Sequence, residues 1–387
     1  MQYMSQATGW ADSFTLAMAP LGILTIVVSA IRVGGPSWLK AIIGRARENL
    51  AAAEVELMSS TSEDVCELWN GSEIVRSLGS PPVREFIILI PKYRNDAKDI
   101  ELDNLNSSAP NPETPPKVII IYNESTSAPN ISLNIHSQKR AEVRAAAVIG
   151  TFLQLGVLIY AGFATYYHTL RFPKEDNRPV SNYAFPCTAS GTILLVTGLL
   201  LCADVVEKRT VEEARKPIGY EAYPIWVQRQ ATVGDQVFRS FGIFSNTPRK
   251  EILTSSRNPK TSTELSLVDG IVRVVCYLPL QVVELFKKAL NKKTSSSTES
   301  SVQSSKTTLG SFLSISGYVV QFVGLRDMHW SVSIVQLGAV VFMTAARAAI
   351  RRGLAVPPKA QSLFQEFELE WLASAIAGTD GSPSGPE

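Results

Sequence analysis

The chain contains apolar runs close to the length that a bilayer crossing requires, and these runs constrain its fold more than any other feature. A helix needs about 20 mainly apolar residues to cross the hydrocarbon core of a membrane. Hydrophobic residues make up 45% of the 387 residues and charged residues only 19%, so the apolar residues are concentrated in few segments. The sequence therefore predicts a mainly α-helical, polytopic membrane protein with about five spans. The runs cover residues 14–33, 145–167, 183–206, 309–325 and 331–350.

The last two runs are separated by the polar sequence RDMHW, which contains Arg326, Asp327, His329 and Trp330. A single helix over residues 309–350 would be about 60 Å long and would hold charged groups near the bilayer centre, where they are costly. Two helices joined by a turn would place the same groups at the membrane boundary. We therefore predict two helices, with this turn as the most distinctive candidate site. It would act as an interfacial anchor or, alternatively, as a small extracytoplasmic binding site.

Basic residues beside the runs set the expected orientation. Span ends rich in Lys and Arg face the cytoplasm, so the prediction is an N-terminus outside, five spans and a cytoplasmic C-terminus. Pro20 would kink the first span, which membrane helices tolerate when a neighbouring group satisfies the freed carbonyl. The basic residues are Arg32, Lys40, Arg45 and Arg47 after the first run, Lys139, Arg140 and Arg144 before the second, Lys208, Arg209, Arg215 and Lys216 after the third, and Arg347, Arg351 and Arg352 at the last.

The polar segments between the runs are expected to form a small α+β part and linkers. The β-branched runs REFIILI, KVIIIY and ISLNI predict a small sheet. Residues 37–58 show helical periodicity beside basic residues, which predicts an interfacial helix continuing from the first span or, equally, a helix packed on a small cytosolic domain. The predicted organisation is a tail and first span at 1–33, a cytosolic α+β region at 34–144, a transmembrane hairpin at 145–206, a cytosolic region at 207–290 with an amphipathic helix at 267–290, a disordered Ser-rich linker at 291–308, a second transmembrane hairpin at 309–352, and a cytosolic helix with a disordered tail at 353–387.

Four N-x-Ser sequons oppose this orientation, because N-glycosylation requires lumenal exposure. Such triplets arise by chance in Ser-rich sequence, and the repeated basic flanks outweigh them. Whether any of the four is glycosylated stays open, as does whether residues 267–290 enter the membrane. The sequons lie at Asn70, Asn106, Asn123 and Asn130.

The sequence shows no recognisable catalytic, metal or phosphate motif. The four cysteines lack ligand or disulfide spacing, and Cys66 lies between acidic residues, which raises the pKa of a thiol and disfavours a nucleophile. The three histidines are His136, His168 and His329, and none is expected to be catalytic. A formal net charge of +2 indicates no nucleic-acid partner. The prediction is a chain without enzymatic activity, cofactor or bound metal.

Several blocks of the sequence resemble one family of fungal multi-pass membrane proteins, whose members often carry ankyrin repeats. The resemblance implies the membrane architecture but no catalytic residue, because no function is assigned to the family. No repeat of about 33 residues is seen in this chain. The blocks are DSFTLAMAPLGILTIVVSAIRVGGPSWLKAIIGRARE, AEVELMSSTSEDVCELWNG, DQVFRSFGIFS, VQFVGLRDMHWSVSIVQLGAVVFMTAARAAIRRGL and EFELEWLA.

Three functions follow as hypotheses. The preferred one is a non-enzymatic scaffold or signalling component whose partners are the lipid bilayer and cytosolic proteins, and an oligomer is compatible with it. The alternative is a small transporter or channel-like oligomer, which predicts that Gln154 and Gln336 face a common interior. The third, a membrane-embedded enzyme, predicts His168 or His329 beside a carboxylate in a cavity.

Overall fold

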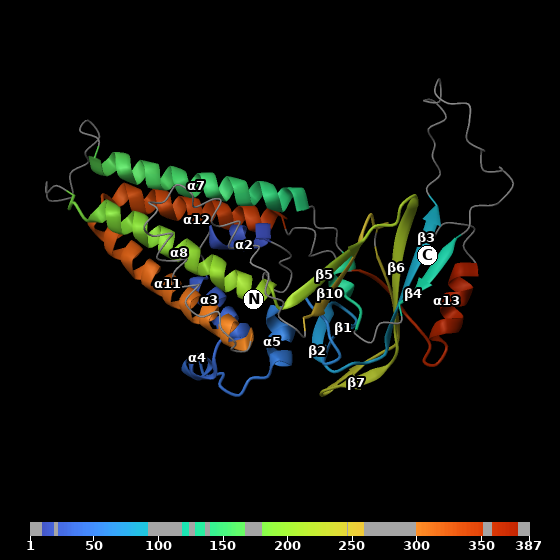
Figure 1. The fold of residues 1–387 in the computed structure, drawn as a ribbon. Helices are drawn as coiled ribbons and strands as arrows, with labels where there is room; N and C mark the ends of the chain where they lie inside the picture. Colours follow the sequence, from blue (N-terminus) through green and yellow to red (C-terminus); the bar gives the residue numbers. More distant parts are fainter. Residues whose placement is uncertain are drawn as a thin grey trace, which may run out of the picture. The chain divides into compact units, whose positions relative to one another are not determined.

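The computed structural model describes residues 10–18, 22–91, 118–123, 128–135, 140–166, 180–245, 247–258, 299–350 and 358–377 (Figure 1). The chain forms two compact units, each assembled from three separate segments. We call them the helical unit (residues 1–59, 138–211 and 257–352) and the sheet unit (residues 60–137, 212–256 and 353–387). The predicted helix at 267–290 and the start of the predicted linker, 291–298, lie outside the described residues, as do His136, His168, Asn106 and Cys276.

Within the described residues, four helices of the helical unit are long and apolar enough to cross a membrane: α7 (Arg140–Tyr166), α8 (Ala184–Glu207), α11 (Glu299–Asp327) and α12 (Trp330–Ile350). The break between α11 and α12 confirms the two-helix prediction for the last two runs. The predicted linker is wrong over residues 299–308, because α11 already begins at Glu299. Gln303 and Thr307 are buried in this first part of α11, so tertiary packing stabilises a helix that composition alone does not favour.

The predicted first span is not one continuous helix in the described residues. It consists of α2 (Trp10–Ala17) and α3 (Ile23–Gly34), each too short to cross a membrane alone. Pro20 lies between them in the sequence and has no backbone N–H for a helical hydrogen bond. Gly22, which precedes α3, has φ +100°, a conformation that favours glycine. The described residues thus form two short helices where the sequence predicted one kinked helix.

Residues 37–58 also form two helices rather than one, α4 (Ser37–Ile42) and α5 (Leu50–Leu57). Pro36 is the N-cap of α4, and the Asn49 side chain caps α5 by accepting a hydrogen bond from the Ala52 amide at 2.9 Å. Gly44 lies between the two helices with φ +74°. This stretch is helical as its periodicity predicts, but Gly44, with its left-handed backbone conformation, separates the two helices.

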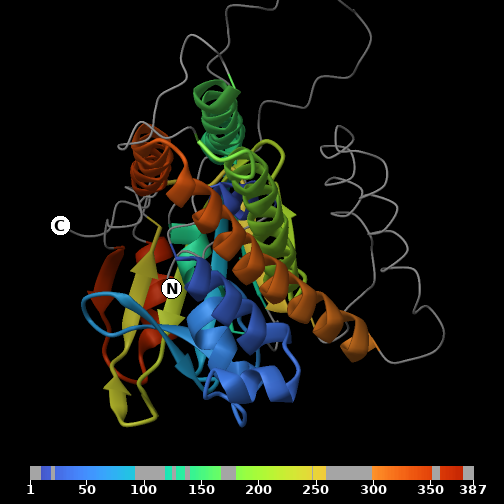
Figure 2. The ribbon, with the colours of Figure 1, turned by 90° about the vertical axis from the view of Figure 1, so that its left-hand side faces the viewer.

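Helices α8 and α11 pack side by side (Figure 2). Their contact includes glycines spaced seven residues apart along each helix. A Cβ atom added to Gly317 of α11 would lie 2.3 Å from the Leu195 amide nitrogen of α8. A Cβ added to Gly191 of α8 would lie 2.3 Å from the Gln321 amide nitrogen. Only glycine allows two backbones to approach this closely, as in other membrane helix pairs with small interface residues. The Gly-rich composition of α11 thus serves helix packing.

The sheet unit is built on a five-stranded antiparallel sheet in the order β11-β9-β6-β3-β4. Its strands come from all three segments of the unit. They are β3 (Val83–Pro91), β4 (Ile119–Tyr122), β6 (Tyr220–Gln228), β9 (Phe241–Phe244) and β11 (Lys359–Ser362). The predictions of strands at REFIILI and KVIIIY are confirmed, but ISLNI forms the helix α6 (Ile131–Ile135).

Alternate residues of β3 and β6 face opposite sides of the sheet. One side is covered by α13 (Glu368–Ala377), whose Leu372 packs with Ile88 and Ile225. On the other side Trp226 packs with Trp69 and with Ile131 of α6. The described residues also form three two-stranded sheets: β1 (Val65–Trp69) with β2 (Ile74–Leu78), β5 (Thr210–Arg215) with β10 (Ile252–Arg257), and β7 (Ala231–Val233) with β8 (Gln236–Phe238).

Candidate functional site

The most distinctive polar site in the helical unit is centred on Arg32, in the last turn of the apolar helix α3. The Arg32 side chain is only 1% exposed, and such burial of a charge is costly unless the charge is paired. Gly34 and Gly35 follow it, and Pro36 starts α4, so the chain turns directly after the arginine. The turn brings the loop between α4 and α5 back onto the end of α3.

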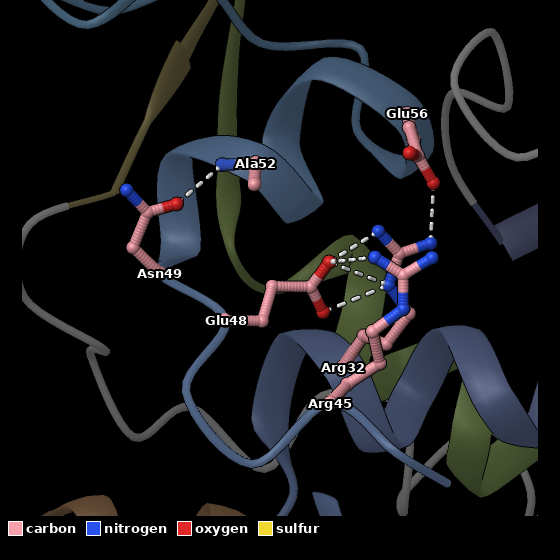
Figure 3. A network of polar contacts seen from close by, with 6 residues as sticks. All are labelled: Arg32, Arg45, Glu48, Asn49, Ala52 and Glu56. Atoms are coloured by element: carbon pink, nitrogen blue, oxygen red, sulfur yellow. Dashed lines mark hydrogen bonds and ion pairs between the residues drawn. The ribbon is translucent and has the colours of Figure 1, made fainter.

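Two glutamates from this returning segment bind the Arg32 guanidinium (Figure 3). Arg32 Nη2 donates to Glu48 Oε1 at 2.5 Å, and Nε donates to Glu48 Oε2 at 2.9 Å. Arg32 Nη1 donates to Glu56 Oε2 of α5, also at 2.5 Å. Glu48 is buried with 4% of its side chain exposed, whereas Glu56 is about half exposed. The two-point contact with Glu48 therefore neutralises the buried charge and ties α3 to the loop before α5.

The hydrogen bonds from Arg32 lower the pKa of Glu48, against the opposing effect of burial. A carboxyl whose pKa is lower in the folded state stabilises the fold above its ordinary pKa of about 4.3. This contribution is lost as the pH falls through the lowered pKa. We predict that the unfolding temperature of the wild type in detergent falls steeply below about pH 4. The stability difference between wild type and Glu48→Gln should be largest at neutral pH and shrink on acidification, and a constant difference would contradict this assignment.

Further buried ionic contacts lie at the ends of α5 and α8 in the same unit. Glu54 of α5 is fully buried and accepts from Arg257 Nη1 at 3.1 Å. Asp204, one turn before the end of α8, pairs with Lys208 Nζ at 3.0 Å. The Ser13 hydroxyl of α2 donates to Glu207 Oε2 at 3.1 Å. These contacts place the beginning of α2 beside the end of α8.

Side chains of two neighbouring helices bind the backbone carbonyls freed by the interruption between α2 and α3. Gln154 of α7 is buried and its Nε2 donates to the Met18 carbonyl at 2.8 Å. Arg347 of α12 donates to the Leu16 carbonyl at 3.4 Å, and Leu16 is the residue four positions before Pro20. These two contacts supply hydrogen-bond partners for the carbonyls of Leu16 and Met18. Gln154 therefore acts as a structural ligand of the broken helix.

We predict that Gln154→Leu lowers the free energy of unfolding by about 1 kcal/mol, the usual size of an interhelical hydrogen bond in a membrane protein. Gln336 provides the matched control, because it is half-buried on α12 and forms no hydrogen bond among the described residues. Gln336→Leu should leave stability nearly unchanged in the same detergent unfolding assay. Equal effects of the two substitutions would argue against the role given to Gln154.

The predicted site at the turn between α11 and α12 is only partly assembled. His329 Nδ1 lies 2.8 Å from Ser331 Oγ, which also accepts from the Tyr160 hydroxyl of α7 at 3.0 Å. Trp330 is 60% exposed, as an interfacial anchor would be. Arg326 and Asp327 form no ion pair with each other in the described structure. The turn is therefore fixed by a contact to Tyr160 that the sequence did not indicate.

The prediction for Cys66 is confirmed in direction, with a different main cause. Burial raises the pKa of the Cys66 thiol to about 12, and neighbouring Glu67 adds a smaller effect. Cys66, Cys187 and Cys202 are all free thiols. Among the residues described, no three His, Cys, Asp or Glu side chains lie close enough to hold a metal ion.

Two of the sequon asparagines have structural contacts in the sheet unit. Asn130 is only 2% exposed, and its amide pairs with both the N–H and the C=O of Ser255 at 2.9 Å. Asn123 Nδ2 donates to Glu85 Oε2 at 2.9 Å. The Asn70 side chain is exposed and caps the turn between β1 and β2. Glycosylation of Asn130 is therefore incompatible with the folded sheet unit.

Comparison of the chain with known proteins gives no family assignment. No protein-family model, no curated protein and no solved structure matches it. The resemblance to fungal multi-pass membrane proteins therefore stays a prediction. The part of the chain that the structure describes contains four apolar helices compatible with a membrane location and an antiparallel sheet unit.

Proposed function

We propose that the protein is a non-enzymatic integral membrane scaffold or signalling component that presents the sheet unit at one face of a bilayer. The observation that carries this proposal is the continuous sheet β11-β9-β6-β3-β4. Its strands come from chain segments before α7, after α8 and after α12. Because hydrogen-bonded strands cannot be separated by a membrane, all three segments must lie on the same side.

This constraint makes α7 and α8 one transmembrane hairpin and α11 and α12 a second. The beginning of α11 lies beside the end of α8, since Gln303 Nε2 donates to the Val205 carbonyl at 3.3 Å. Both ends therefore belong to the membrane face that carries the sheet unit. The turn at Arg326–Trp330 then lies at the opposite face.

Helices α2 and α3 enter and leave the membrane on one side in this proposal, as a re-entrant hairpin. Ser13 of α2 binds Glu207, and Gly34 of α3 lies against Val205, so both outer ends meet the last turn of α8. The inner end, Met18, packs instead with Val196, which lies about 15 Å deeper along α8. The N-terminus would thus lie on the same side as the sheet unit, with four full spans.

The basic residues at the sheet-unit ends of the spans support a cytoplasmic location of that unit. Arg140 and Arg144 lie at the start of α7, Lys208 and Arg209 at the end of α8, and Arg347 at the end of α12. The lipid bilayer is the first partner in this proposal. The many exposed apolar side chains of α7, α11 and α12, such as Phe152, Phe322 and Phe342, are suited to contact with it.

Cytosolic protein partners would bind the sheet unit. Phe364 and Phe367 are 86% and 62% exposed there, next to strand β11. The test replaces Phe364 with a photoreactive phenylalanine analogue in the full-length chain in cells. The proposal predicts a cross-linked adduct of one discrete mass that is lost in the Phe367→Ala background. No adduct, or the same adduct with the photoreactive residue at exposed Asp235, would contradict it.

A transporter or channel-like oligomer is the second candidate, because re-entrant hairpins and interrupted helices also build transport sites. Against it, Gln154 is bound to the Met18 carbonyl, and the α8–α11 contact is filled by backbone atoms. Ion or solute flux through vesicles containing purified protein, abolished by Gln154→Leu, would favour transport over the scaffold.

A further inference from the structure

A cluster of basic side chains lies at the end of α8 in the helical unit, beside the beginning of α11 and next to the network around Arg32. Lys208 and Arg209 follow the last turn of α8, Lys306 lies in the second turn of α11, and Lys40 belongs to α4. Lys306 interacts with Lys208, and Lys40 interacts with Arg209. The adjacent residues Lys208 and Arg209 join these two pairs of like charges.

Three nearby acidic side chains do not balance the four cations of this cluster. Glu207 attracts Lys208 and also accepts a hydrogen bond from Ser13. Asp204 is shared between Lys208, which it contacts at 3.0 Å, and the more distant Lys306. Glu48 attracts Lys40 electrostatically, but its carboxylate already binds Arg32. In the part of the chain that the structure describes, no carboxylate oxygen lies within 4.0 Å of Lys40, Arg209 or Lys306. The cluster therefore carries excess positive charge.

The cations are also partly removed from water. Arg209 Nε is buried without a hydrogen-bond partner among the described residues. Burial lowers the pKa of Arg209, and burial together with the charge of Arg209 lowers the pKa of Lys40. An anion binds such groups more tightly than it binds fully hydrated surface lysines, because folding has already removed part of the water around the cations.

We propose that Lys40, Lys208, Arg209 and Lys306 bind the headgroup of an anionic lipid at the membrane boundary, where its net negative charge distinguishes it from a zwitterionic lipid. The proposal rests on the membrane location of the helical unit, where the spans α8 and α11 place these side chains at headgroup depth. A phosphate with several acceptor oxygens can bridge basic groups from α4, α8 and α11 at once. It would replace their mutual repulsion by attraction and fasten α4 to the ends of both spans.

The test measures binding of a tail-labelled fluorescent phosphatidylserine to the purified full-length protein in neutral detergent micelles. Phosphatidylcholine with the same label is the reference lipid. Each basic residue near an anionic lipid contributes about 1 kcal/mol, which corresponds to roughly fivefold in affinity. We expect Lys306→Gln to weaken phosphatidylserine binding about fivefold and Lys40→Gln with Arg209→Gln about 25-fold. Lys306→Arg, which keeps the charge, should bind like the wild type.

The matched control is Arg215→Gln with Lys216→Gln, which removes two exposed bases of the sheet unit and should leave binding unchanged. Equal binding of the two lipids, an equal loss in the control, or no loss in either cluster variant would overturn the proposal. Displacement of the lipid by millimolar inorganic phosphate would assign the site to a soluble phosphate instead. Failure of the wild type to enter phosphatidylcholine vesicles would refute the proposed membrane location itself.

Discussion

Gly317→Ala is expected to abolish folding or to lower the free energy of unfolding by about 3 kcal/mol or more. The added methyl group would lie 2.3 Å from the Leu195 nitrogen and 2.9 Å from the Gly191 carbonyl oxygen. Both are backbone atoms of α8, so no side chain can move aside to relieve the contact. The two helices would have to separate along their length, because the same close contact recurs at Gly198 and Gly324. Unfolding temperature in detergent and yield of monodisperse protein measure the effect.

Gly156→Ala supplies the matched control, since Gly156 lies inside α7 and a Cβ there would meet nothing within 4 Å. Alanine is the better helix former by about 0.5–1 kcal/mol, so this variant should be as stable as the wild type or more stable. Glycine-to-alanine substitution is thus expected to lower the free energy of unfolding at Gly317 and to leave it unchanged or raise it at Gly156. A mild effect at Gly317 would mean that α8 and α11 are not in backbone contact.

Arg32→Met is the second substitution with a large expected effect. It leaves Glu48 buried without its hydrogen bonds from Arg32, and breaking a buried ion pair from one side costs about 3–5 kcal/mol. Arg45→Gln is the control, because Arg45 is 52% exposed and its contact with Glu48 is 3.5 Å long. A surface pair of this kind contributes about 0–1 kcal/mol.

A double-mutant cycle separates the charge from the packing. Arg32→Met combined with Glu48→Met removes both charges, and apolar replacements of a buried pair are often neutral. The double variant should therefore be more stable than Arg32→Met alone in detergent unfolding. The cycle compares the losses of unfolding free energy in Arg32→Met, in Glu48→Met and in the double variant. If the loss in the double variant equals the sum of the two single losses, Arg32 contributes through its packing in α3 and not through the ion pair.

The helical unit was largely predictable because its signals are local. Apolar run length indicated α7, α8, α11 and α12, and the polar pair Arg326–Asp327 marked the break before α12. Pro20 signalled a weak point in the first run, but the sequence did not show that the chain turns back there. That depends on which end of α8 each helix contacts, as the Ser13–Glu207 and Gly34–Val205 contacts show.

The sheet unit was mostly missed, because its strands pair across long stretches of sequence. Strands β6 and β9 are rich in aromatic residues without clear alternation. In the sequence, the pair α7–α8 separates β6 from its partner β3, and the pair α11–α12 separates β9 from its partner β11. Buried amides were also unrecognised. Gln228 is fully buried and binds the Trp69 backbone through both its oxygen and its nitrogen, although a lone glutamine gives no such signal in sequence.

The most direct test of the account is a topology map with single cysteines in a cysteine-free background. The substitutions are Ser5→Cys, Asp235→Cys, Arg326→Cys and Lys359→Cys, labelled with an impermeant thiol reagent in sealed vesicles before and after permeabilisation. We predict that positions 5, 235 and 359 label on one side and position 326 on the other. Labelling of positions 5 and 326 on the same side would mean that residues 14–33 cross the membrane, and it would contradict the re-entrant hairpin. Labelling of 235 and 359 on opposite sides would contradict the shared sheet and the central claim.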